Sequence, residues 1–255
     1  MPAPDLMAAE LELTGRITTA SNATFLGSIG ATEVVYKPIA GESPLWDFPH
    51  GKLAYREVAA YLVSQAFGWD IVPQTWLRDG PLGEGMAQLW KEPDAGQSPV
   101  ELVLEGSRPG TGWKQVLTGH DESGRVVELV HEDTESLRRM AVFDVVVNNA
   151  DRKGNHILAM PDGHRYGVDH GLTFHREHKL RTVLWGWLGQ TLDDDELAGI
   201  GRVLEGLEGQ LGRDLDKLLT GKEIDALAAR CQRLQSTGTF PGPSGQMPAV
   251  PWPLF

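Results

Sequence analysis

The chain has 255 residues, of which 41% are hydrophobic and 23% charged, with a single cysteine. This length allows one large domain or two lobes, and one cysteine excludes an internal disulfide and fits a reducing compartment. The net charge of −12 argues against a nucleic-acid-binding surface, which needs clustered cations. No apolar run reaches the ~18 residues of a membrane span, and the acidic N-terminus lacks the features of a signal peptide, so we expect a cytoplasmic protein.

The N-terminal part of the sequence predicts an antiparallel sheet. Apolar alternation indicates three strands, over residues 11–20, 24–29 and 33–39. Ser21 and Asn22 fall in the polar turn between the first two strands, where backbone N–H groups could cover the phosphates of a nucleotide. Lys37 shares a face with Val35 and could pair with the phosphate oxygens. The turn is not glycine-rich, so an exposed hairpin lysine is the alternative.

Residues 53–67 have the spacing of a helix that ends at Gly68. Glu57 falls on a stripe of small or apolar residues, which places its carboxylate away from solvent. A buried carboxylate needs a partner, and Lys37 is the first candidate. The alternatives are a local pair with Arg56 or a position on the surface.

Two further strands flank a Gly/Pro turn, over residues 70–77 and 85–92. The second would run along an adenine pocket and continue as a connector that begins around Trp90. Residues 91–115 are rich in loop-forming residues and are expected to join two lobes. Helical character returns from Glu135, and Asp144, inside the apolar half of that helix, is interpreted as an acceptor for backbone donors.

The segment 148–174 contains the highest density of chemically useful side chains. A polar loop, a strand, a Pro-Asp-Gly-His turn and a second strand ending in Asp169 predict a hairpin with acidic groups at its mouth. Mg²⁺ takes carboxylate, water and phosphate oxygens, so this arrangement suits a cation held against phosphates. Asp151 could orient an attacking hydroxyl as a base, and Asp169 could bind the metal. A surface hairpin with an acidic turn is the alternative.

The C-terminal part of the chain predicts helices and a tail. Residues 193–235 have the pattern of two amphipathic helices that break near Thr220. Residues 236–255 contain five prolines and are expected either to be disordered or to lie across the surface. In the second case Trp252 and Phe255 are the candidate anchors.

These parts occur in the order of a kinase: a phosphate-covering turn, a strand lysine, a helix glutamate, a connector, a catalytic aspartate and a metal-binding strand end. The sequence resembles the atypical branch that contains the phosphatidylinositol 3/4-kinases. It is most similar to type II phosphatidylinositol 4-kinases and their small bacterial relatives, and more distantly to HipA-like kinases. The motifs are VVYKPIAGESP, YREVAAYLVS, FDVVVNNADRKGNHIL and GVDHGLTFH followed by KLRTVLWGW. The pair VVNNADR and VDHGLTF is the most specific part.

The resemblance covers roughly residues 13 to 200 and implies an α+β, two-lobed protein-kinase-like fold. An N-terminal antiparallel sheet with one helix would form the first lobe, over residues 1–90. A mainly helical lobe with the catalytic and metal-binding loops would follow over residues 91–235, and residues 236–255 would be the proline-rich tail.

The resemblance also implies a role for individual residues. The nucleotide would be bound by Lys37, Glu57, Ser21, Asn22, Gln88, Leu89 and Trp90. In this set Lys37 would contact the phosphates and Glu57 would fix that lysine. Asp151 would be the catalytic aspartate and Asp169 the principal Mg²⁺ ligand. Lys153, beside the catalytic position, could neutralise the transferred phosphoryl group.

The chain departs from the family pattern at the second metal ligand. Family members usually place an asparagine five positions after the catalytic aspartate, but here that position is His156 and the asparagine is Asn155. Either residue could reach the ion. His156 is favoured because it directly precedes the strand that begins at Ile157. Imidazole suits Mn²⁺ better than Mg²⁺, so the expected cofactors are ATP with Mg²⁺ or Mn²⁺.

We therefore expect an ATP-dependent phosphotransferase that moves the γ-phosphate to a hydroxyl group. The acidic charge and the lack of a basic or apolar docking segment favour a protein or a small polar molecule as acceptor over an inositol lipid. One alternative is transfer of AMP on the same fold. Another is a pseudokinase, a nucleotide-sensing interaction module that binds ATP without turnover.

Overall fold

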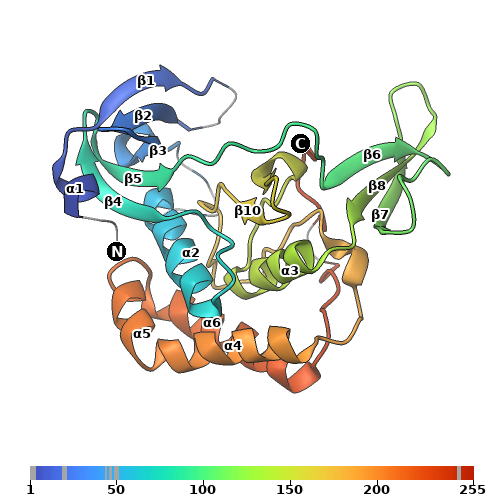
Figure 1. The fold of residues 1–255 in the computed structure, drawn as a ribbon. Helices are drawn as coiled ribbons and strands as arrows, with labels where there is room; N and C mark the ends of the chain where they lie inside the picture. The colour runs from blue at the N-terminus through green and yellow to red at the C-terminus, as the bar shows by residue number, and fades with distance from the viewer. Residues whose placement is uncertain (1–3, 19–21, 44, 46–47, 49–51, 246–247) are drawn as a thin grey trace.

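A five-stranded antiparallel sheet forms the N-terminal part of the structure, a computed structural model that describes residues 4–18, 22–43, 45, 48, 52–245 and 248–255. Its strand order is β1-β2-β3-β5-β4 (Figure 1). The strands are β1 (Glu12–Arg16), β2 (Phe25–Ile29), β3 (Thr32–Pro38), β4 (Thr75–Gly80) and β5 (Gly83–Leu89). The short helices α1 (Pro4–Ala8) and η1 (Ile39–Gly41) flank the sheet. Each of the five predicted strands overlaps a strand of this sheet, although the predicted strand over residues 70–77 begins only at Thr75 and continues to Gly80.

Helix α2 (Leu53–Phe67) lies beneath this sheet and connects it to the helical part of the molecule (Figure 1). It ends at Gly68, whose left-handed φ of 74° matches the predicted C-terminal cap. The helix packs against β4 and β5 on one side and against α3, α4 and α5 on the other. Because both sides are covered, ten of its residues are buried, including Glu57 at 1% exposure.

A three-stranded sheet, in the order β6-β8-β7, follows the connector and projects from the body of the molecule (Figure 1). Its strands are β6 (Val100–Leu104), β7 (Trp113–His120) and β8 (Val126–Glu132). The prediction that residues 91–115 form a loop-rich connection was wrong over β6 and the start of β7. The five residues of β6 are short and lie among Gly, Pro and Ser, and their pairing partner β8 comes more than twenty residues later.

The C-terminal part is mainly helical. Its helices are α3 (Glu135–Val147), α4 (Asp194–Leu207), α5 (Gln210–Leu215) and α6 (Gly221–Thr237), with single turns η2 (Gly154–His156) and η3 (Trp185–Trp187). A hairpin of β9 (Ile157–Ala159) and β10 (Arg165–Gly167) lies between α3 and η3. The fold class is the predicted mixture of an antiparallel sheet with one helix and a mainly helical second part. The lobe boundaries at residues 90 and 235 stay predictions.

The segment after Asp193 forms three helices, whereas two were predicted. The additional break lies at Gly209, between α4 and α5. At Gly212, in α5, a Cβ atom would lie 2.0 Å from the carbonyl oxygen of Leu207, so the close turn requires glycine. The repeat LEGLEGQLG keeps a helix-like apolar spacing through this break, which is why the pattern did not reveal it.

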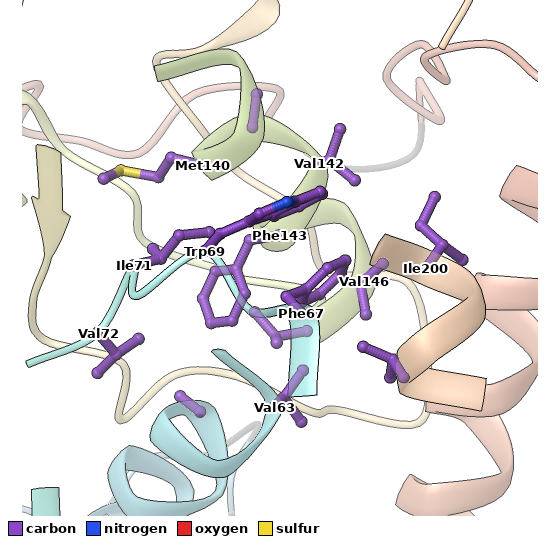
Figure 2. Close-up of a cluster of buried hydrophobic side chains, with 14 of the residues drawn as sticks. Val63, Phe67, Trp69, Ile71, Val72, Met140, Val142, Phe143, Val146 and Ile200 are labelled. Carbon is purple, nitrogen blue, oxygen red and sulfur yellow. The ribbon is translucent and has the colours of Figure 1, made fainter. Parts of the chain in front are cut away.

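The largest hydrophobic core joins α2 to α3 and α4 (Figure 2). Phe67 at the end of α2 stacks on Trp69 with ring centroids 4.4 Å apart, and Phe143 of α3 meets Phe67 edge to face. Ile200 of α4 lies on the far side of this cluster (Figure 2). The core therefore holds α2 against the end of α3, after which the segment with Asp151 and His156 begins. Within the described part of the chain, no helix has the length and apolarity needed to cross a bilayer.

Buried His131 in β8 makes the stability sensitive to acid. Its Nδ1 lies 2.8 Å from the Glu132 carbonyl oxygen, to which it donates, and its Nε2 accepts the Gly186 N–H at 3.0 Å, so the ring is neutral. Burial lowers the pKa of His131 from 6.5 to about 4. As the pH falls, His131 takes up a proton in the unfolded chain before it does so in the folded chain. The stabilising contribution of the neutral ring to the free energy of unfolding is therefore complete above about pH 6.5 and is lost as the pH falls toward 4. We expect a loss of about 3 kcal/mol over that range.

Urea unfolding at several pH values measures this loss. A His131→Gln protein keeps a side chain that can donate and accept, but it has no titrating group there, so its stability should fall less between pH 6.5 and 4. Parallel pH profiles for the two proteins would show that other buried histidines cause the acid sensitivity.

Candidate active site

A cavity of about 410 Å³ lies between the N-terminal sheet and the β9–β10 hairpin. Its walls come from the first strands, from β5 and the connector after it, and from the segment around the hairpin. The predicted site residues that line it are Asn22, Lys37, Gln88, Leu89, Trp90, Asn155, His156 and Asp169. Residues from three distant parts of the sequence therefore meet around one space. Ser21 lies outside the described residues.

Lys37 of β3 is the charged centre of this cavity. Its Nζ lies 2.6 Å from Oε1 of Glu57 and 2.8 Å from Oδ1 of Asp169. The other Glu57 oxygen, Oε2, accepts the His170 N–H at 2.9 Å. The predicted pairing of Lys37 with Glu57 is therefore present. The alternative partner Arg56 instead forms a salt bridge with Glu223 of α6.

The opposite charges of Lys37 and Asp169 stabilise each other. Burial alone would lower the pKa of Lys37, but the carboxylates of Asp169 and Glu57 outweigh it and hold that pKa above its usual value. The neighbouring ammonium of Lys37 is the main cause of a lowered pKa for Asp169. Asp169 also has a left-handed φ of 60°, which is strained for a residue with a side chain. The fold therefore holds this carboxylate in a fixed and unusual position.

His156 faces the second oxygen of Asp169. Its Nδ1 lies 2.9 Å from the Asp151 carbonyl oxygen, and its Nε2 lies 3.4 Å from Asp169 Oδ2. Burial lowers the pKa of His156, which favours the neutral ring. If Nδ1 donates to the carbonyl, Nε2 presents a lone pair to a carboxylate that can only accept, so a proton or a cation is needed between them. Asn155 also lines the cavity, with an exposed side chain.

The possible cation ligands are few. Among the described residues, no group of three or more His, Cys, Asp or Glu side chains is arranged to hold a metal ion. Asp169 and His156 offer one oxygen and one nitrogen that face each other. The carboxylate oxygen fits Mg²⁺ or Mn²⁺, and the imidazole nitrogen fits Mn²⁺ better; either ion would complete its shell with phosphate oxygens and water.

Asp151 and Lys153 lie in the loop after α3, next to His156. Lys153 Nζ is 3.2 Å from Asp151 Oδ2, and Asn149 Oδ1 accepts the Asp151 N–H at 3.0 Å. Burial raises the pKa of Asp151. Neither Asp151 nor Lys153 is among the described residues that line the cavity. The two side chains form a separate polar pair beyond the His156 ring.

One group of residues that line the cavity is apolar. Ile17 and Val35 line it from the sheet side, and Leu158 and Val168 line it from the hairpin side. The sequence analysis did not assign these four residues to the site. Their one signal was the alternation of each strand, and alternation does not distinguish the face of a cavity from the face of a core.

The predicted adenine-facing strand also lines the cavity. The backbone N–H groups of Leu89 and Trp90 are already bonded to the carbonyl oxygens of Gln74 and Glu33. The Gln88 side chain donates to Thr75 at 2.8 Å. Leu89, Trp90 and Gln88 therefore line the cavity, but these donor groups are already bonded within the protein. The lining continues along the connector from Lys91 to Pro93.

Arg152 is a second charged centre that the sequence analysis did not single out. It is fully buried, and its guanidinium pairs with Asp144 of α3 at 2.8 Å. It also donates to the carbonyl oxygens of His156 and Val168, and Nη2 lies 2.7 Å from His170 Nε2. The interpretation of Asp144 as an acceptor for backbone donors was wrong, because its partners are the side chains of Arg152 and Asn149. The sequence did contain one indication of this pair. Asp144 lies in an apolar run, and a buried carboxylate needs a cation as its partner.

The C-terminal tail lies across the surface and reaches this loop. The Ala249 carbonyl oxygen accepts the Thr182 N–H, and the Leu254 carbonyl oxygen accepts the Gly154 N–H at 2.9 Å. The Phe255 ring lies so close to Gly154 that a Cβ atom there would approach it to 2.4 Å. Phe255 is thus a contact residue, as predicted. Trp252 as an anchor was wrong, because it is 85% exposed.

Comparisons with known proteins identify a sequence family, a similar sequence and a similar structure. Residues 50–184 match the sequence family described as phosphatidylinositol 3- and 4-kinase. Protein Rv2133c of Mycobacterium tuberculosis is 49% identical over 259 residues, covering 96% of this chain and 92% of that protein. The crystal structure of a Helicobacter pylori proinflammatory kinase, CtkA, has a TM-score of 0.51 at 12% identity, covering 93% of this chain and 95% of that chain. The last similarity shows a shared fold.

Proposed function

The chain belongs to the phosphatidylinositol 3- and 4-kinase family, and on that premise we propose that it transfers the γ-phosphate of ATP to a hydroxyl group of a protein or a small polar molecule. The observation that carries this proposal is the position of Lys37, which bonds both Glu57 and Asp169 and lines the 410 Å³ cavity. An ammonium held between two carboxylates beside apolar walls suits a nucleotide whose phosphates lie at the ammonium and whose base lies between the apolar side chains.

In this proposal Lys37 binds the nucleotide phosphates and Glu57 keeps the lysine in place. The apolar walls around Val35 and Leu158 hold the base, and Asn22 lies where the turn would cover the phosphates. Asp151 accepts the proton of the attacking hydroxyl, and its raised pKa makes it a better base than an ordinary aspartate. Lys153, 3.2 Å from that carboxylate, stabilises negative charge on the phosphoryl group as it moves.

We assign the metal ion to Asp169 and His156, with Asn155 as the alternative to the histidine. When bound, the ion would neutralise charge on the phosphate oxygens. The neutral His156 ring with its Nε2 toward Asp169 supports this assignment. An imidazole ligand favours Mn²⁺ relative to a site made of oxygens alone.

The class of acceptor is proposed from the net charge of the protein. A net charge of −12 would weaken binding to an anionic membrane surface, which favours a protein or a small polar molecule over an inositol lipid. A second candidate function is a pseudokinase that binds ATP without turnover. It is favoured by His156, which stands where the family usually places an asparagine.

Labelled ATP tests the proposal. The protein is incubated with ATP labelled at the γ- or the α-phosphate, with Mg²⁺ or Mn²⁺ and a dephosphorylated cell lysate as the source of acceptors. We expect transfer of the γ-label and no transfer of the α-label. Transfer of the α-label would identify AMP transfer. A thermal shift with ATP but no transfer in any condition would identify the pseudokinase.

A Lys37→Met protein provides the matched binding test. It should lose both transfer and the ATP-dependent thermal shift, because its side chain has no charge for the phosphates. Lys217→Met, at an exposed lysine in the turn after α5, serves as the control and should behave as wild type. Equal ATP binding by the Lys37→Met and wild-type proteins would contradict the location of the nucleotide.

A further inference from the structure

A second cavity, of about 120 Å³, lies beside α6 and away from the nucleotide cavity. Arg230 and Arg233 of α6 line it together with His178, and the hydroxyl-bearing Thr237 and Thr239 complete its polar part. Arg230 and Arg233 are three residues apart, so they share one face of the helix. The cavity is much larger than the ~30 Å³ that a water molecule occupies in the liquid.

Arg230 is a buried guanidinium without a carboxylate. It is 8% exposed, its Nε donates to the Val146 carbonyl oxygen at 2.7 Å, and its Nη1 makes a long contact of 3.4 Å with the His175 carbonyl oxygen. Its Nη2 has no hydrogen-bond partner. Burial, with a smaller contribution from Arg233, lowers the pKa of Arg230 to about 10. The fold therefore places a cation where an anion would be stabilised strongly.

The other buried arginines of the described chain show what is missing here. Arg56, Arg152 and Arg165 each form a salt bridge with a carboxylate, from Glu223, Asp144 and Glu132 respectively. Arg78 donates to three backbone carbonyl oxygens. Among these buried arginines only Arg230 has a fully buried side-chain nitrogen without a hydrogen-bond partner.

The surroundings of the cavity add positive charge. Arg233 is exposed at its rim, and burial together with Arg233 and Arg230 lowers the pKa of His178. The nearest carboxylate in sequence, Glu177, makes its contacts with Arg176 and Lys179, at 3.9 and 4.0 Å. A local excess of cations in a chain with a net charge of −12 needs a specific reason.

We propose that this cavity binds a phosphate group, held by the guanidinium groups of Arg230 and Arg233 and by His178. Arginine presents its N–H groups as a planar fork that matches two oxygens of a phosphate, which makes such pairs strong and specific. The cavity is too small for a nucleotide, compared with the 410 Å³ of the first cavity, but suits inorganic phosphate or the end of a phosphate monoester.

The position of Arg230 connects this site to the catalytic segment. Val146, whose carbonyl oxygen Arg230 contacts, is in the last turn of α3, two residues before Asn148. Asn148 donates to the same His175 carbonyl oxygen that Arg230 approaches. A bound phosphate would fix Arg230 and thereby the junction between α3 and the segment after Asp169. Binding of phosphate at this site does not depend on whether the protein carries out the proposed phosphoryl transfer.

Inorganic phosphate is the first probe. Thermal unfolding is recorded with potassium phosphate and with potassium chloride at equal ionic strength, both with saturating ADP so that the nucleotide cavity is filled. Phosphate should raise the melting temperature and chloride should not, because only a ligand of the folded state shifts the transition. Titration calorimetry of the same samples gives the affinity.

Two variants locate the phosphate. Arg233→Gln, at an exposed position, should fold normally and weaken phosphate binding about tenfold or more, since a hydrogen bond to a charged group is lost. Arg230→Lys keeps the buried charge but removes the fork and should have a similar effect. Lys217→Gln, in the turn after α5, is the control for loss of one exposed cation and should bind as wild type. Wild-type phosphate affinity in both arginine variants, or an equal shift with chloride, overturns the proposal.

Vesicles identify the source of the phosphate. Phosphatidylcholine vesicles with and without phosphatidic acid present the same monoester on a surface. If the wild-type protein sediments with the phosphatidic acid vesicles and the Arg233→Gln protein does not, the site binds a lipid headgroup. Binding of inorganic phosphate without sedimentation would assign it to a soluble phosphate. Both results support the site.

Discussion

An Asp151→Asn protein is expected to transfer the γ-phosphate about 10²–10⁴ times more slowly than wild type, which is the usual contribution of a positioned general base. Asparagine keeps the size of the side chain but cannot accept the proton of the attacking hydroxyl. Asp151 is not among the described residues that line the nucleotide cavity, so ATP affinity should change little. The predicted effect is therefore a large loss of rate with intact binding.

Initial rates with γ-labelled ATP and calorimetric titration with ATP measure the two quantities separately. Asp162→Asn is the matched control, because Asp162 lies in the exposed turn of the β9–β10 hairpin, after the Asp151 loop, and its carboxylate accepts the His164 N–H. That variant should keep wild-type activity. Wild-type activity in Asp151→Asn would show that another group accepts the proton, and a parallel loss of ATP binding would place Asp151 with the nucleotide.

The pair of Lys37 and Glu57 could be predicted from sequence because each position is set by a local pattern. The strand period places Lys37 on the face of Val35, and the helix period places Glu57 on the buried side of α2. Two oppositely charged groups that both point inward must neutralise each other. The structure brings them to 2.6 Å.

The contacts that sequence could not predict depend on segments that meet only after folding. The strand β6 exists because β8 pairs with it, and its five residues carry too short a pattern to indicate this. The His156 ring points its Nε2 toward Asp169, and this orientation depends on the η2 turn and on the left-handed backbone at Asp169. The period of a strand or a helix fixes the side on which a residue lies, but not the identity of the group opposite it.

Replacing Arg152 with methionine is expected to destabilise the protein by about 3–5 kcal/mol, because it leaves the Asp144 carboxylate buried without a cation. For a chain of this size the loss corresponds to a fall in melting temperature of about 6–20 °C. Both side chains of the pair are 0% exposed, so water cannot replace the guanidinium. Urea unfolding of Arg152→Met and of Arg125→Met compares this pair with the exposed pair of Arg125 and Asp121, for which about 1 kcal/mol or less is expected.

A double variant separates charge from packing. If the unpaired carboxylate causes the loss, Asp144→Leu combined with Arg152→Met should be more stable than Arg152→Met alone. The recovery should be incomplete, because Arg152 also donates to the carbonyl oxygens of the proposed metal ligand His156 and of Val168, which precedes the proposed ligand Asp169. ATP binding should therefore stay weaker in the double variant than in wild type even where stability returns. Equal stability of the Arg152→Met and Arg125→Met proteins would mean that the buried pair of Arg152 and Asp144 does not stabilise the fold more than an exposed pair does.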